Sequence, residues 1–189
     1  MTTITQHYQH CFNIIASCKT WLKLITTTFV LGMFFGAVFH ESLSTKIFPI
    51  IAEIHEKTHD LDSYQLAWFI AQNNIISAFV GMISGIALGI IPFLHALING
   101  IVVGFVLHKA TLFSGISAWW KLVPHGLLEL PAIFIALSLG INIDHAWWHS
   151  QPITRLKINL TEALQAFILV VVPLLLLAAP IESFISANL

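Results

Sequence analysis

The stretch Pro124-His125-Gly126-Leu127-Leu128-Glu129-Leu130-Pro131-Ala132-Ile133-Phe134-Ile135-Ala136 carries one histidine and one carboxylate in sequence that is otherwise apolar enough to enter a bilayer. The two ionisable residues are four positions apart. On a helix these positions share a face, so their side chains can touch. Because a buried ionisable group is costly unless it is paired, such a pair in a membrane segment predicts a functional site.

The composition of the whole chain supports a membrane protein. Of its 189 residues, 57 % are apolar and only 9 % are charged, and the mean hydropathy is +0.86. Globular domains carry about 25 % charged residues, so this chain has too little charge to cover a water-facing surface. The net charge of −1 gives no basic surface for nucleic acid. We therefore expect an all-α integral membrane protein whose first partner is the lipid bilayer.

Apolar runs of a length close to the roughly 20 residues that cross hydrocarbon predict about five spans. They cover residues 21–39, 74–91, 94–113, 124–143 and 160–180. We expect them to form one transmembrane bundle over residues 21–189, preceded by a cytoplasmic segment at 1–20. Cys11 and Cys18 in that segment are more simply explained as unpaired thiols than as a disulfide. Asn159 and Thr161 resemble the N-cap of the last span.

The region between the first two spans, residues 40–70, has a different character. Ile47, Phe48, Ile50, Ile51 and Ile54 form an apolar stripe at helical spacing, and carboxylates are frequent around it. This pattern predicts an amphipathic helix that lies at the interface or packs on the bundle, followed by a polar turn at 58–63. It also offers a surface for a protein partner.

Orientation follows from the distribution of lysine and arginine. Lys19 and Lys23 precede the first span, and Arg155 and Lys157 lie in the loop between the fourth and fifth. Positively charged loops stay in the cytoplasm. We therefore predict a multi-pass protein of the cell membrane with its N-terminus inside and its C-terminus outside, although this places Lys109 and Lys121 outside.

Glycines recur at four-residue spacing in the spans. Gly81, Gly85 and Gly89 share one helix face, and Gly100 and Gly104 repeat the pattern in the next span, as do Gly32 and Gly36 in the first. Small residues at this spacing let another helix backbone approach closely. The partner helix is either in the same chain or in a second copy, so a homodimer is the alternative to intramolecular packing.

Five polar residues are candidates for an intramembrane site: Asn74, Asn99, His125, Glu129 and Glu182. An asparagine at a helix start is often only a cap, which is the alternative for Asn74, and Asn99 needs a hydrogen-bond partner that we expect on another helix. For His125 and Glu129 the alternative is a solvated loop that leads into the helix. The residues contain no His-Glu-x-x-His motif, Ser/His/Asp order or nucleotide-binding loop, so we predict no bound metal, no cofactor and no catalytic residues.

The segment Pro124–Ala132 resembles the hallmark of the stage II sporulation protein M family of multi-spanning membrane proteins. Asn73-Asn74, the run Gly81–Gly89, Asn99-Gly100-x3-Gly104 and the ending Pro173–Phe184 fit the same pattern in the same order, over roughly residues 22–186. The resemblance implies that the polar family positions map to the five candidates above. The member that gives the family its name is similar to a scaffold, which recruits peptidoglycan-degrading partners to the septal membrane during engulfment.

Three functions fit these observations. The first is a membrane scaffold or assembly factor that recruits partner proteins through the 40–70 region, in line with the family resemblance. The second is a small transporter or channel-like protein that uses the His125–Glu129 pair for proton or cation coupling. The third is an intramembrane hydrolase in which the same pair activates water.

Overall fold

The structure is a computed structural model that describes the backbone of residues 4–87 and 89–187, and their side chains except those of 4, 118–125, 127–128 and 181–187. Over these residues the chain is helical and contains no strand. Five segments are long and apolar enough to cross a membrane: Lys19–Val38, Ser63–Ile86, Ile90–Ser114, Glu129–Trp148 and Pro152–Pro180. The predicted all-α membrane fold with about five spans is confirmed.

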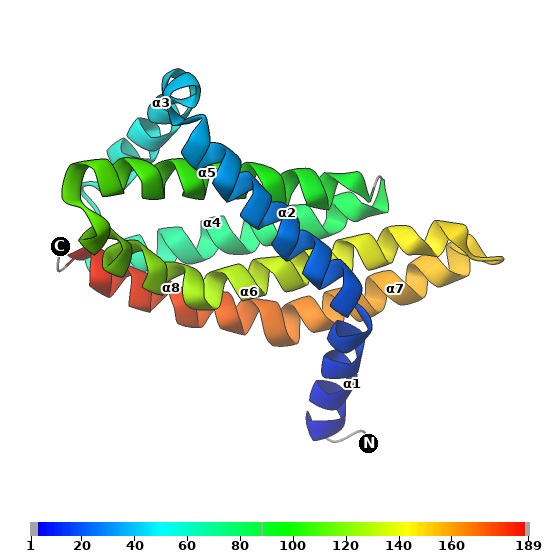
Figure 1. Ribbon diagram of the computed structural model, residues 1–189. Coiled ribbons are helices and arrows are strands. Elements are labelled where there is room, and N and C mark those ends of the chain that lie inside the picture. The colour runs from blue at the N-terminus through cyan, green and yellow to red at the C-terminus, as the bar shows by residue number, and fades with distance from the viewer. Residues whose placement is uncertain (1–3, 88, 188–189) are drawn as a thin grey trace.

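The elements follow one another through short links. In chain order they are α1 (Ile4–Ser17), α2 (Lys19–Val38), α3 (His40–Thr58), α4 (Ser63–Ile83), η1 (Ser84–Ile86), α5 (Ile90–Ser114), η2 (Ile116–Ala118), α6 (Trp119–Asp144), η3 (His145–Trp148), α7 (Pro152–Ala166), η4 (Phe167–Val171) and α8 (Val172–Ala187). The η4 element is a single π-helical turn that joins α7 to α8 in one long helix. Figure 1 shows α4, α5, α6 and the α7–α8 helix side by side, with α2 running obliquely across them and α1 and α3 projecting from the bundle.

The second spanning helix begins well before the predicted residue 74, at Ser63. A capping box fixes this start: the Asp62 carboxylate accepts the backbone N–H groups of Tyr64 and Gln65, both at 2.9 Å. The Gln65 side chain in turn accepts the Asp62 N–H at 3.1 Å. These bonds satisfy amide groups that the first turn of a helix leaves without partners. Asn74 therefore lies inside α4 and is not a cap.

The last span also begins earlier than predicted, and the proposed cap at Asn159 is wrong. The helix starts at Pro152, and Asn159 lies in its interior, only 3 % exposed. Its amide Nδ2 donates a hydrogen bond of 2.7 Å to the carbonyl oxygen of Asn142 on α6. The neighbouring sequence suggested that Asn159 caps the helix, but its side chain instead forms a hydrogen bond between two helices.

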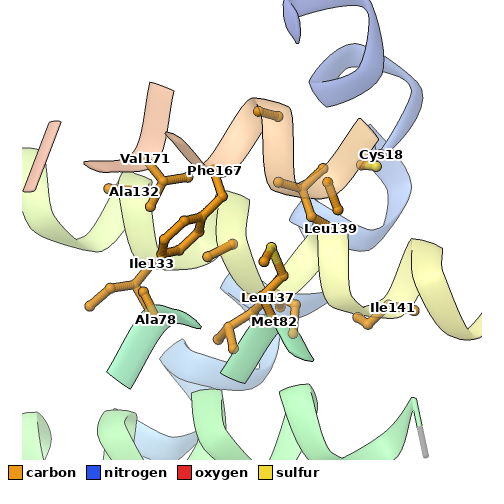
Figure 2. Packing of buried hydrophobic residues seen from close by; sticks show 14 of the residues in the cluster. Cys18, Ala78, Met82, Ala132, Ile133, Leu137, Leu139, Ile141, Phe167 and Val171 are labelled. Carbon is orange, nitrogen blue, oxygen red and sulfur yellow. The ribbon is translucent and has the colours of Figure 1, made fainter. Parts of the chain in front are cut away.

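The core is built around α6, which lies between α4 and the α7–α8 helix. Figure 2 shows Ile133 and Leu137 of α6 with Ala78 and Met82 of α4 on one side and Phe167 of η4 nearby. These residues are less than 10 % exposed. Burial of each large apolar side chain of this kind contributes about 1.5–3 kcal/mol in a water-soluble protein, whereas between membrane helices close packing supplies the stabilisation.

The glycines of α2 and α5 form a close crossing of two helices. A Cβ atom on Gly36 would lie 2.8 Å from the carbonyl carbon of Ile101, and one on Gly104 would lie 2.6 Å from Met33 Cα. No side chain fits at these distances, so backbone packs directly against backbone. A Cβ on Gly85 would likewise lie 2.9 Å from Gly140 Cα on α6.

The remaining glycines of the predicted series also face helices of the same chain. A Cβ on Gly100 would lie 3.2 Å from Gly32 Cα, one on Gly81 would meet the Leu137 side chain, and one on Gly89 would meet the Asp144 carboxylate. Because these faces are covered within a single chain, a homodimer would have to use another surface.

The two helices that project from the bundle differ in how they are held. Helix α1 contacts α7 and buries Cys11 and Ile14, and Cys18 is buried at its junction with α2. Both thiols are free, as predicted. Burial raises the pKa of each thiol, while a backbone hydrogen bond opposes this for Cys11 and a hydrogen bond with Ser17 opposes it for Cys18. Helix α3 has a single buried residue, Ile47.

Candidate functional site

Helix α6 places the His125–Glu129 motif inside a continuous helix. The helix begins at Trp119 and continues through Pro124 and Pro131 to Asp144. The alternative of a loop at Pro124-His125-Gly126 therefore does not hold for the backbone, and positions 125 and 129 lie one helical turn apart on the same face. Glu129 is half-buried, whereas the side chain of His125 lies outside the described residues.

Asn74 and Glu129 lie at a similar depth on neighbouring helices. Helices α4, α6 and α8 pack against one another, and α4 and α6 both start at the same end of the bundle (Figure 1). Asn74 is eleven residues into α4 and Glu129 is ten residues into α6, so each is about 15 Å from that end along its helix. Asn74 is also half-buried. Glu182 belongs to α8, which ends at the same side, but its side chain lies outside the described residues.

Asn99 is separate from this group. It is exposed on α5, and its Nδ2 donates a hydrogen bond of 2.8 Å to the carbonyl oxygen of His95, one turn earlier in the same helix. The expected partner on another helix is thus replaced by the backbone of α5 itself. The amide is satisfied locally, and nothing in this geometry connects it to Asn74 or Glu129.

A polar contact that the sequence did not single out joins α4 to α5. His95 Nε2 and Ser77 Oγ share a hydrogen bond of 3.2 Å, whose donor depends on the imidazole tautomer. Both residues are half-buried. Gly81 lies beside the ring, and a Cβ on this glycine would be 3.4 Å from His95 Nδ1, at ordinary van der Waals distance. The four-residue spacing of Ser77 and Gly81 was the available signal, because it places a hydroxyl and a glycine on one helix face.

The family model of stage II sporulation protein M matches residues 25–187. The chain belongs to this family. The matched region includes most of the first spanning segment, the other four in full and every candidate residue, so the expected family membership is confirmed. No curated protein and no solved structure matches the chain.

A second histidine contact in this SpoIIM-family protein lies where α2 meets α3. The rings of His40 on α3 and His108 on α5 are stacked with centroids 4.1 Å apart and an interplanar angle of 25°. His40 Nδ1 is buried and has no hydrogen-bond partner among the described residues. Burial lowers the pKa of His40 below its ordinary value of 6.5; the nearby His108 and Lys109 lower the pKa further, and Glu41 opposes them. Burial and the two neighbours therefore disfavour the charged form of His40.

The same corner anchors α3 to the SpoIIM bundle through aromatic contacts. The rings of Phe48 and Phe105 meet edge to face at 5.5 Å. Lys109 Nζ lies 5.9 Å from the centre of the first ring and 5.8 Å from that of the second, within the range of a cation–π contact. Sequence alone showed only that Phe48 belonged to an apolar stripe.

Within the described ranges, no three His, Cys, Asp or Glu side chains lie together so as to hold a metal ion. The contacts of His95 and His108 described above are with Ser77 and His40. The contacts of polar side chains between helices, such as those of His95 with Ser77 and His40 with His108, are instead at different places along the bundle.

Proposed function

We propose that this protein is a membrane scaffold that recruits partner proteins through α3. The observation that carries the proposal is the uncovered surface of this helix. Phe48, Ile50 and Ile54 are 46 %, 52 % and 51 % exposed, although they lie on a helix that is not one of the membrane-spanning segments. An apolar face that the fold itself leaves open is typical of a surface that binds something else.

The charge of α3 favours a protein partner over lipid. Helices that lie on anionic membranes carry lysine and arginine on their polar face. In contrast, α3 has three glutamates and only two lysines: Glu41, Glu53, Glu56, Lys46 and Lys57. One of these lysines is already paired, since Lys57 Nζ is 2.7 Å from a Glu53 oxygen. A net acidic helix beside a bilayer is better suited to a partner protein with basic residues.

The interior of the bundle supports a scaffold more than a transporter. Among the described residues, the buried polar side chains are those of Ser138 and Asn159. The Ser138 hydroxyl donates to the carbonyl oxygen of Phe134 at 2.6 Å, and Asn159 is bonded to α6 as described above. Neither side chain is available to a passing ion or proton. The second hypothesis is proton or cation coupling by Glu129. In that case Asn74, at a similar depth on the neighbouring helix α4, would be part of the same site.

The proposed orientation places α3 outside the cell membrane. The rings of Trp21 and His145, with centroids 6.4 Å apart, bring the start of α2 close to the α6–α7 connection. Lys19, Lys23, Arg155 and Lys157 thus share one end of the bundle, which we assign to the cytoplasm. Because α2 crosses the membrane once before α3, this helix is on the other side.

Site-specific photo-crosslinking in native membranes tests the scaffold. A photoreactive residue at position 50 or 54 should give discrete protein adducts that mass spectrometry can identify. The matched control is position 98, where Ile98 is 59 % exposed on the spanning helix α5; we expect it to give lipid adducts only. Equal protein adducts from α3 and from position 98 would exclude specific recruitment by α3.

Two variants separate the scaffold from the transporter. The double variant Ile50→Ser/Ile54→Ser should abolish the crosslinked partner, and Glu129→Gln should leave it. Glu129→Gln should also leave the proton permeability of reconstituted liposomes unchanged, because a scaffold conducts none. Proton flux that the wild-type protein supports and Glu129→Gln abolishes would refute the scaffold and establish transport.

A further inference from the structure

A shallow pocket at the connection between η3 and α7 is not used by the proposed scaffold function. Its volume is about 240 Å³. It is lined by side chains that are cationic, polar or apolar, with no carboxylate among them: His149, Ser150, Gln151, Thr154, Arg155 and Ile158. An open pocket that combines hydrogen-bond donors with a cation and excludes negative charge has the chemistry of an anion site.

The cation in this pocket is the only arginine in the chain. Within the described part of the structure, Arg155 forms no salt bridge, and it is exposed. Its guanidinium group can present two parallel N–H donors to two oxygens of one phosphate group, which lysine cannot do. The hydroxyls of Ser150 and Thr154 line the same space and supply further donors.

The surroundings of the pocket fit a phosphate at a membrane surface. Trp147 and Trp148 precede it and are 46 % and 82 % exposed; tryptophans of this kind lie at the level of lipid headgroups. Trp147 is also fixed to the bundle, since its Nε1 donates a hydrogen bond of 3.1 Å to the carbonyl oxygen of Ile86. Ile153 is 65 % and Ile158 is 42 % exposed, so apolar surface adjoins the polar pocket as acyl chains adjoin a headgroup.

We propose that this pocket binds a phosphate group, with Arg155 as its principal ligand. The aromatic and apolar surface beside it makes an anionic phospholipid the expected source, and a free phosphate ion is the other source with the same chemistry. The site does not depend on α3 or on the scaffold function, because it lies at the opposite end of the spanning helices.

Native mass spectrometry of the purified full chain in detergent, titrated with phosphatidylglycerol, phosphatidylcholine or inorganic phosphate, tests the proposal. Arg155→Gln should weaken binding of phosphatidylglycerol about tenfold, the effect of losing one charge-assisted contact. Arg155→Lys should give an intermediate loss, because it keeps the charge but not the fork. The matched control is Lys157→Gln, which removes the same charge two residues away, outside the pocket, and should change binding less than about twofold.

The lipids distinguish the sources of the phosphate group. Binding of phosphatidylglycerol that inorganic phosphate does not displace supports a lipid site, and displacement by millimolar phosphate supports a site for the free ion. Equal losses in Arg155→Gln and Lys157→Gln would overturn the proposal, since they would show diffuse charge attraction. No loss in Arg155→Gln would overturn it as well. Thermal unfolding of each variant, expected to match the wild type because both side chains are exposed, controls for folding.

Discussion

The crossing of α2 and α5 gives the sharpest test of how this bundle holds together, through the substitution Gly104→Ala. The new methyl carbon would lie 2.6 Å from both the carbonyl carbon and Cα of Met33, and closer still to the carbonyl oxygen. Carbon atoms in good contact are about 3.5–4.0 Å apart. All these atoms belong to backbone, so rotation of a side chain cannot relieve the overlap, and the two helices must separate by about 1 Å.

The cost follows from what this separation does to the rest of the crossing. A gap of roughly 0.5–1 Å forfeits a quarter to a half of the attraction at each contact, and the crossing also includes Gly32, Gly36 and Gly100. Overpacking of this kind costs about 1–3 kcal/mol, while alanine regains up to about 1 kcal/mol of helix propensity over glycine. We expect a net loss of about 1–2 kcal/mol, and a Tm lower by roughly 3–6 °C for a chain of this size.

Thermal unfolding in detergent, followed by circular dichroism, measures this loss. The matched control is Gly126→Ala on α6, where a Cβ would lie 3.0 Å from Leu130 Cδ1, the end of a flexible side chain. This control gains the same helix propensity without a clash against backbone, so it should unfold at or slightly above the wild-type Tm. A Gly104→Ala protein that unfolds within about 1 °C of the wild type, or a Gly126→Ala protein that loses as much, would refute the proposed role of backbone contact.

Two further predictions concern polar side chains. Asn159→Ala removes the donor to Asn142 and should lower the free energy of unfolding by about 1–2 kcal/mol. Asn99→Ala removes an exposed hydrogen bond within one helix and should change the free energy of unfolding by less than about 0.5 kcal/mol. Equal losses in the two variants would contradict the role of Asn159 as a link between two helices. The lowered pKa of His40 means that the folded chain binds fewer protons than the unfolded chain below the ordinary pKa of 6.5. The stability due to this group is therefore fully present above pH 6.5 and is lost as the pH falls through the lowered folded-state pKa. His40→Phe keeps an aromatic ring against His108 and should flatten the dependence of Tm on pH below pH 6.5. The same slope of Tm against pH in this variant and in the wild type would contradict the prediction.

The class of fold and the number of spans were determined by the sequence itself. Apolar runs near the length of a bilayer core, with few charges, leave a chain no other way to bury its surface and satisfy its backbone. Four-residue glycine spacing likewise predicted close helix packing, and the Pro124–Ala132 motif pointed to the family. Element boundaries were less well determined, because a polar side chain such as Asn74 or Asn159 looks the same in sequence whether it caps a helix or lies within one.

Only the tertiary structure decided which faces meet. Periodicity shows which residues share a face of a helix, but not how that helix is rotated in the bundle or which neighbour covers the face. Asn99 and Asn159 illustrate this limit. The rotation of α5 exposes Asn99, which bonds to the backbone of its own helix, whereas the rotation of α7 points Asn159 toward α6, where it bonds to the backbone of that helix. The contact between His95 and Ser77 depends on the same rotation, because residues 18 positions apart meet only when two helices pack with the correct register.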